Sequence, residues 1–216
     1  MSAFTGVDPM NINYRKDLAR ILGEVEKLPE KPALLLHACC GPCAAPVLER
    51  LSPYFDITVF YYNPNTAPEA EFYRRLEALN TIAAAQQEPV TVLVPEYRPE
   101  TFYGPAAGME HLPEGGKRCH LCWDLRLRET AREAKARGFT WFGSTLTVGP
   151  TKNARVINPM GDALAAEFGL RWLTADFKKD GGYDRARILC QQYGLYRQDF
   201  CGCTPSYREA HLDDYQ

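Results

Sequence analysis

The chain has 216 residues, of which 45% are hydrophobic and 24% charged, and its formal net charge is -2. This length and composition predict one globular domain, and they exclude a disordered chain and a strongly basic, general nucleic-acid binder. No apolar run approaches the ~20 residues of a membrane span, and the N-terminal residues lack the apolar core of a signal peptide, so we expect a cytoplasmic protein without a membrane partner.

Hydrophobic periodicity predicts helices and strands that alternate along the chain. A helix over residues 12–27 comes first, within a helical lead-in of residues 1–32, and Pro29 and Pro32 end it. The predicted strands lie at residues 33–38, 57–62, 90–94, 139–144 and 170–173. The predicted helices lie at residues 44–51, 69–86, 121–137, 153–168 and 184–193. Irregular structure is expected at residues 98–117, which are rich in Pro and Gly, and in the tail after residue 193.

Strand–helix alternation with crossovers of this length predicts an α/β fold, in which a doubly wound, mainly parallel sheet is covered by helices on both faces. We assign residues 33–208 to this single α/β domain and residues 209–216 to a C-terminal tail. Sheets of this kind bind ligands beyond the C-terminal ends of their strands. The first predicted strand ends in a cysteine-rich loop, so the fold and the chemistry indicate the same place.

Three cysteines, Cys39, Cys40 and Cys43, lie in the loop after the first strand. A helix follows the loop, and its free N–H groups and partial positive charge favour thiolates. Buried cysteines that act as small hydrophobic residues are the alternative. Three cysteines within five residues instead favour metal or redox chemistry. In a reducing compartment, clustered cysteines usually bind metal or carry out redox reactions.

Cys119 and Cys122 form a Cys-x-x-Cys pair near the start of a predicted helix. Metal hooks and thioredoxin-type redox pairs share this spacing, but a redox pair should follow a strand early in a compact domain. Two thiolates from each cluster suit either a [4Fe-4S] cluster or structural zinc. We favour the cluster, because the first loop carries an additional thiol and lies where α/β sheets bind ligands.

A third cluster, Cys201-Gly202-Cys203, lies in the irregular tail. A disulfide between residues two apart closes a small, strained ring that is easily reduced, so the pair suits the cycling of electrons. The alternative is two further metal ligands. Cys190 falls inside a predicted helix, and we expect it to be a packed core residue.

Together with these cysteines, longer motifs resemble the epoxyqueuosine reductases of the QueH family. The matching segments occur in order at residues 34–43, 60–65, 118–122, 144–152 and 194–203. The resemblance implies a Rossmann-like fold similar to that of the nucleotide alpha-hydrolases, although cysteines replace the phosphate loop of the ATP-using relatives. It also implies an oxidoreductase that reduces epoxyqueuosine to queuosine at the wobble position of tRNA, the final step of queuosine biosynthesis.

The resemblance also implies roles for the cysteines. Cys39, Cys40, Cys119 and Cys122 match the ligands of a [4Fe-4S] cluster, and Cys201 and Cys203 match a redox-active pair. Cys43 is a candidate ligand of an additional metal, an iron ion, since some family members carry an acidic residue at this place.

Reduction of an epoxide to an alkene takes two electrons and two protons and releases water. An electron donor is therefore a required partner beside the tRNA, and the residues do not identify it. His37, Tyr61 and Asp199 are candidate proton donors because they lie in or beside the motifs, although His37 equally suits a hydrogen-bonded strand residue. The wobble base must leave its stack to be reached. Candidate phosphate contacts are Lys117, Arg118, Lys152, Arg155, Lys178 and Lys179.

The residues by themselves leave two other functions as alternatives. One is an iron–sulfur-dependent tRNA sulfur-transfer or desulfurising enzyme on the same scaffold. The other, of a different class, is a zinc-stabilised RNA-binding module. The content of iron and acid-labile sulfide separates the RNA-binding module from both enzymes.

Overall fold

The computed structural model describes residues 12–211, so residues 1–11 of the predicted lead-in and residues 212–216 of the predicted tail lie outside it. The strands are β1 (Ala33–His37), β2 (Asp56–Phe60), β3 (Thr91–Leu93), β4 (Trp141–Ser144) and β5 (Arg171–Trp172). The helices are α1 (Tyr14–Val25), α2 (Gly41–Leu51), α3 (Glu69–Ala84), α4 (Glu100–Tyr103), α5 (Lys117–Ala136), α6 (Ala154–Phe168), α7 (Gly182–Gln192) and α8 (Thr204–Ala210), with a 3₁₀ turn at Leu146–Val148.

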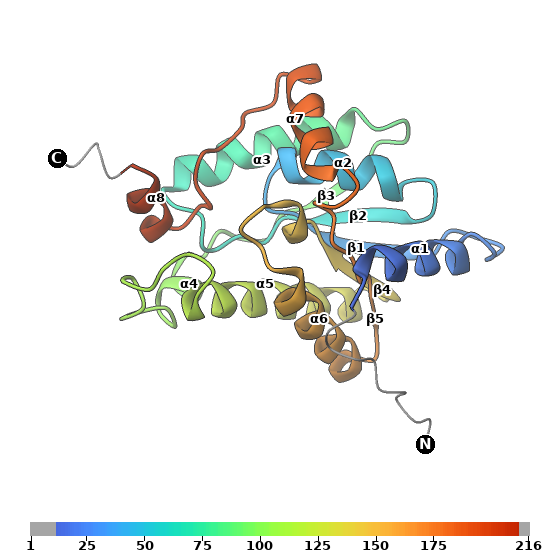
Figure 1. The fold of residues 1–216 in the computed structure, drawn as a ribbon, viewed down its shortest axis with the longest axis horizontal. Helices are drawn as coiled ribbons and strands as arrows, with labels where there is room; N and C mark the ends of the chain where they lie inside the picture. The colour runs from blue at the N-terminus through green and yellow to red at the C-terminus, as the bar shows by residue number, and fades with distance from the viewer. Residues whose placement is uncertain (1–11, 212–216) are drawn as a thin grey trace.

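The strands form one sheet in the order β3-β2-β1-β4-β5, and every pairing is parallel (Figure 1). β1 lies at the centre, where Leu34 pairs with Ile57 of β2 on one side and with Trp141 of β4 on the other. The chain extends the sheet first through β2 and β3, then returns to the other side of β1 for β4 and β5. The predicted fold class is therefore confirmed, and the point where the direction reverses lies between β1 and β4.

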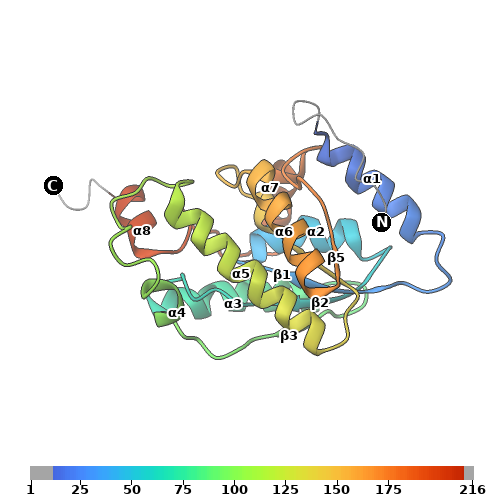
Figure 2. The ribbon, with the colours of Figure 1, turned by 90° about the horizontal axis from the view of Figure 1, so that it is seen from below.

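Helices cover both faces of the sheet, as the two ribbon views show (Figures 1 and 2). Leu34 and Leu36 of β1 face a core built with α1, α2, α3 and α7, whereas Leu35 faces a second core built with α5 and α6. Each fully buried leucine contributes about 1.5–3 kcal/mol relative to an exposed one. The strand thus reads as a continuous apolar run because both of its faces are buried.

Several element ends differ from the prediction in ways that matter for the cysteines. α2 begins at Gly41, because Pro42 fits the first helical turn, and Cys43 therefore lies inside the helix and not in a loop. α5 begins at Lys117, so its cysteine pair lies within the helix. The tail is not irregular throughout, since α8 forms with Pro205 in its first turn. Among the described residues, no helix is long and apolar enough to cross a membrane.

Candidate active site

The first cysteine loop lies beyond the C-terminal end of β1, at the reversal point of the sheet. Cys40 caps α2 with extended backbone, and the next residue, Gly41, passes directly against α3. A Cβ at Gly41 would clash with the carbonyl oxygen of Ala78, so the close approach requires glycine. This path brings the sulfur atoms of Cys39, Cys40 and Cys43 within 4.8 Å of one another.

These three thiols differ in how readily they ionise. Hydrogen bonds from the thiols of Cys40 and Cys43 lower the pKa of Cys39, and the Arg126 guanidinium lowers it further. Hydrogen bonding to Cys39 raises the pKa of Cys40 and that of Cys43. The Sγ atoms of Cys39 and Cys40 are 3.7 Å apart. In the metal-free protein, the first negative charge of the trio therefore resides on Cys39.

The second pair projects from the first turns of α5. The Sγ atom of Cys119 accepts the backbone N–H of Gly115 at 3.2 Å. Cys122 and Cys203 belong to one small buried cluster with Phe102 and Ala106, so the second and third cysteine clusters share this part of the core. Burial raises the pKa of Cys119 and raises that of Cys122 to about 12. Both thiols therefore need a bound metal or a nearby cation to ionise at neutral pH.

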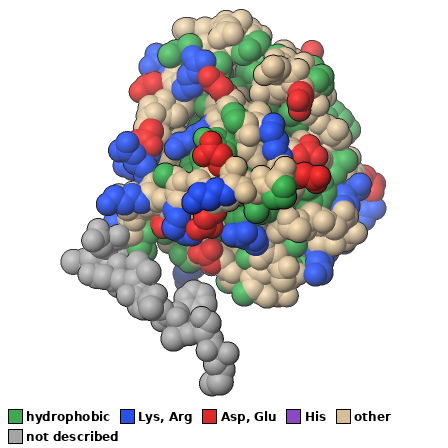
Figure 3. Space-filling model, turned by 90° about the vertical axis from the view of Figure 1, so that its right-hand side faces the viewer, with side chains coloured by type: hydrophobic (Ala, Val, Ile, Leu, Met, Phe, Trp, Pro, Cys, Tyr) green, Lys and Arg blue, Asp and Glu red, His purple; other side chains and the backbone are tan. Residues whose placement is uncertain are grey.

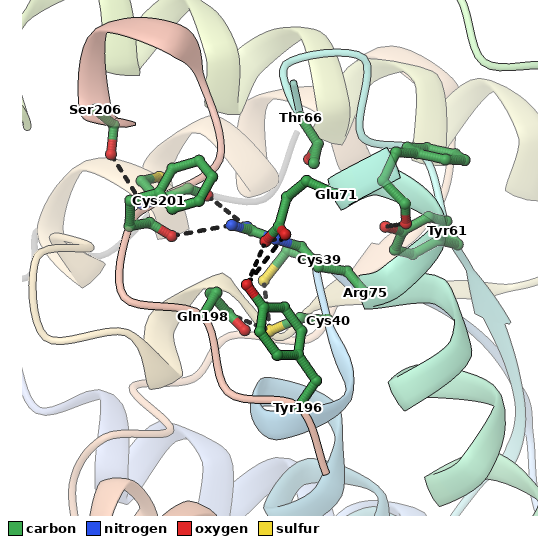
Figure 4. Close-up of polar contacts among 12 residues, drawn as sticks. Cys39, Cys40, Tyr61, Thr66, Glu71, Arg75, Tyr196, Gln198, Cys201 and Ser206 are labelled. Atoms are coloured by element: carbon green, nitrogen blue, oxygen red, sulfur yellow. Dashed lines mark hydrogen bonds and ion pairs between the residues drawn. The ribbon is translucent and has the colours of Figure 1, made fainter. Parts of the chain in front are cut away.

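The tail carrying the third cluster lies against the first cysteine loop (Figure 4). The Gln198 side chain donates from Nε2 to the Sγ atom of Cys40 at 2.9 Å. Gly202 has a φ of 131°, and its carbonyl oxygen accepts the N–H of Ala67 at 2.8 Å. A Cβ at Gly202 would lie 2.9 Å from Nη1 of Arg75, so glycine meets both the backbone and the space requirement.

The side chain of Arg75 reaches from α3 to this tail (Figure 4). It is 1% exposed and donates to the carbonyl oxygens of Cys201 at 2.9 Å and Phe200 at 3.1 Å. Its Nε forms an ion pair with Glu71 at 2.7 Å, and the hydroxyl of Tyr196 donates to the same carboxylate at 3.0 and 3.1 Å. The two buried charges of α3 thus fix the backbone on the N-terminal side of the Cys-x-Cys pair.

Thiols from all three cysteine clusters act electrostatically on one buried cation, Arg126 of α5. Burial lowers the pKa of its guanidinium, but the thiols of Cys122, Cys201, Cys39 and Cys119 outweigh burial and raise it. Each cluster supplies at least one of these thiols. Among the described residues, however, only Cys39, Cys40 and Cys43 have their sulfur atoms within 4.8 Å of one another, so the joining of Cys119 and Cys122 to Cys39 and Cys40 in one metal site stays a prediction.

A cleft of about 620 Å³ lies beside the first and third cysteine clusters. From the cysteine clusters, its lining includes Cys39, Cys43 and Cys201. Lys152 and Glu114 also line the cleft, and their charged groups are 2.8 Å apart. Burial lowers the pKa of Lys152, but Cys201 and Glu114 outweigh burial and raise it. A permanently charged ammonium therefore faces the cleft beside the Cys201 thiol.

The three candidate proton donors lie in different surroundings. His37 is fully buried, with Nδ1 2.9 Å from the Ser144 hydroxyl and Nε2 3.2 Å from the carbonyl oxygen of Tyr62. Burial lowers its pKa to about 4, so the ring is neutral and donates from Nε2. Tyr61 is also buried and donates to the carbonyl oxygen of a residue in α3. Of the three, Asp199 alone lines the cleft.

The predicted phosphate contacts also separate into groups. Arg118 is buried and donates to three backbone carbonyl groups of the preceding excursion, so it orders this segment and is not available to RNA. Lys117, Arg155 and Lys179 are exposed. Cys190 packs in the core, as predicted, and its α7 position also places it in the cleft wall.

Sequence reasoning overlooked Arg126, Arg75 and Glu114. Arg126 could have been found, because it follows Cys122 by four residues and therefore lies on the same face of the helix. No local sequence pattern indicates that Arg75 or Glu114 belongs to the site. Their partners there, Cys201 and Lys152, are distant in the chain.

Comparison with known proteins extends over nearly the whole chain. The family model described as epoxyqueuosine reductase QueH matches residues 34–209. A Staphylococcus epidermidis protein named epoxyqueuosine reductase QueH is 38% identical over 208 residues, covering 94% of this chain and 87% of that protein. Proteins of the same name are 36% identical in Streptococcus pyogenes, covering 94% of this chain and 83% of theirs, and 33% identical in Thermotoga maritima, covering 83% and 94%.

Proposed function

The chain belongs to the epoxyqueuosine reductase QueH family, and from this membership we propose that it reduces epoxyqueuosine to queuosine at the wobble position of tRNA, the final step of queuosine biosynthesis. It is accordingly an oxidoreductase that acts in tRNA processing. The structural observation that supports the proposal is that cysteines of two clusters distant in the chain, Cys39 and Cys43 of the first and Cys201 of the third, line one cleft.

The cofactor we propose is a [4Fe-4S] cluster bound by Cys39, Cys40, Cys119 and Cys122. The donor set supports it, because all four are free thiols, and soft thiolates select iron–sulfur clusters or zinc over harder metals. The sulfur of Cys43 lies with those of Cys39 and Cys40, which supports Cys43 as a ligand of an additional iron ion. When bound, such a centre supplies electrons singly and an electrophile for oxygen.

We propose that Cys201 and Cys203 are the redox-active pair. Oxidation of the two thiols to a disulfide releases two electrons and two protons, which balances the removal of the epoxide oxygen as water. Cys201 lines the cleft, whereas Cys203 is buried behind it. Lys152 lines the same cleft, so the pair presents the sulfur of Cys201 to the cleft in the company of an ammonium group. An external donor then returns the disulfide to the dithiol.

The cleft suits a single nucleobase turned out of the anticodon stack, because ligand sites of about 300–1,000 Å³ hold molecules of this size. Asp199 is the favoured proton donor among the three candidates, since it lines the cleft. A neighbouring groove of about 850 Å³ shares Pro150, Thr151 and Lys152 with the cleft and is also lined by Arg155 and Lys179. We place the phosphate contacts there, because Arg155 and Lys179 are exposed and Arg and Lys side chains are the usual partners of phosphate oxygens. The face of the molecule in Figure 3 carries Lys and Arg side chains interspersed with Asp and Glu side chains.

The decisive experiment combines analysis of the purified protein with analysis of its product. After anaerobic purification, we expect about four sulfides and about five iron atoms per chain, four in the cluster and one as the additional ion. With tRNA carrying epoxyqueuosine and a chemical reductant, digestion and mass spectrometry of the nucleosides should show queuosine. Zinc without iron, or an intact cluster with unchanged epoxyqueuosine, would overturn the proposal.

A further inference from the structure

Arg126 combines deep burial with a free hydrogen-bond donor. It is 2% exposed, and on α5 it follows Cys119 by seven residues and Cys122 by four, so the three side chains share one helical face. Its Nε donates to the carbonyl oxygen of Cys122 at 3.1 Å. Its Nη2 is buried and has no hydrogen-bond partner among the described residues.

The same side chain also reaches the first cysteine loop. Nη1 of Arg126 lies 3.5 Å from Oδ1 of Asn63, at the weak limit of a hydrogen bond. Asn63 is fully buried and donates from Nδ2 to the carbonyl oxygen of Ala38 at 2.9 Å. Ala38 directly precedes Cys39. The guanidinium therefore contacts the backbone of Cys122 directly and reaches the loop of Cys39 through Asn63.

Charge balance separates Arg126 from the other buried arginine of the site. Arg75 has a carboxylate partner, Glu71. Arg126 has no carboxylate within ion-pair distance in the part of the chain that the structure describes. A buried guanidinium without a counter-charge costs several kcal/mol. The negative groups near it are the cysteine thiols themselves, with Cys122 and Cys201 foremost.

We propose that Arg126 is a positioning residue for the metal centre: its free Nη2 donates a hydrogen bond to a sulfur atom of the thiolate-bound cluster, and its charge offsets that of the ligands. The inference rests on the [4Fe-4S] cluster proposed above. Reduction adds one negative charge beside the guanidinium. A fixed positive charge with an N–H···S bond therefore favours the reduced form and raises the reduction potential.

Arg126→Met and Arg126→Lys test this inference through the reduction potential, measured by anaerobic titration of the visible and electron paramagnetic resonance signals. We expect Arg126→Met to shift the reduction equilibrium at least tenfold toward the oxidised form, which is about 59 mV for a one-electron couple. Arg126→Lys keeps the charge without the guanidinium geometry and should fall between Met and wild type. Arg128→Met removes the same charge from the exposed face of α5 and should leave the potential unchanged.

A second measurement needs no destabilised variant. In wild-type protein with ¹⁵N-labelled arginine, pulsed electron paramagnetic resonance of the reduced cluster should show a nitrogen coupling that is absent from Arg126→Lys. If Arg126→Met has full cluster content and an unchanged potential, the inference about Arg126 is wrong but the proposed cluster stands. The same holds if the wild-type spectrum lacks this coupling. Protein that contains zinc and no iron overturns the proposed cluster as well, so the two failures are distinguishable.

Discussion

Replacement of Arg75 by methionine tests whether buried charge holds the cysteine tail in place. Methionine keeps most of the side-chain length but removes the donors to Cys201 and Phe200 and leaves the Glu71 carboxylate buried without its partner. Hydrogen bonds of charged groups contribute about 1.5–3 kcal/mol each, and breaking a buried ion pair from one side costs about 3–5 kcal/mol. Because these contributions overlap, we expect a total loss of about 3–5 kcal/mol.

Urea unfolding of the metal-free protein measures this loss as a fall in the free energy of unfolding, and thermal unfolding should show a melting temperature lower by about 6–20 °C. Cys201 should also react faster with iodoacetamide, because its backbone is no longer held. Arg74→Met is the matched control: Arg74 is exposed on the same helix and lies over the Tyr196 ring at 3.7 Å, an interaction of about 0.5–1 kcal/mol.

A double variant separates the burial of an unpaired charge from the loss of the tail contacts. Arg75→Met with Glu71→Gln should be more stable than Arg75→Met alone, since no buried carboxylate then lacks a partner. The double variant should still show the faster alkylation of Cys201. A loss below about 1 kcal/mol in Arg75→Met, with unchanged alkylation, would refute the idea that this arginine holds the tail.

Three further predictions follow from the site. Cys122→Ser should lose the visible iron–sulfur absorption while Cys190→Ser retains it, and full absorbance in folded Cys122→Ser would remove Cys122 from the ligand set. The double variant Cys201→Ser, Cys203→Ser should keep its iron but lose multiple-turnover activity with a dithiol reductant. A one-electron reductant should restore part of this activity, whereas loss of iron would indicate that the two cysteines are metal ligands. Burial raises the pKa of Glu114, but hydrogen bonding and charge from Lys152 outweigh burial and lower it below 4.5. This stabilisation is present above pH 4.5 and is lost as the pH falls through the folded-state pKa, so acid unfolding of Glu114→Gln should show a shallower pH dependence, and an identical dependence would contradict it.

Much of the architecture follows from local patterns in the sequence. β1 is an apolar run because it is buried on both faces, and the repeated strand and helix signals around it allow few arrangements other than a doubly wound parallel sheet. The cysteine motifs are also local, so the sequence alone is enough to predict metal or redox chemistry for them. Helix starts were less predictable, because Pro42 extends α2 backwards to Gly41 and so moves Cys43 from a loop into a helix.

The assembly of the site depends on long-range packing. His37, Tyr61 and Asp199 all lie in or beside motifs, yet the fold gives His37 and Tyr61 buried partners and leaves Asp199 on the cleft. Arg75 and Cys201 meet across 126 residues of chain, and no local pattern encodes that contact. Side-chain chemistry and spacing, which are local, were enough to predict candidate metal ligands and a candidate redox pair. The strand order and the docked tail bring Cys39, Cys43 and Cys201 to one cleft, because such contacts between distant segments arise only when the chain packs.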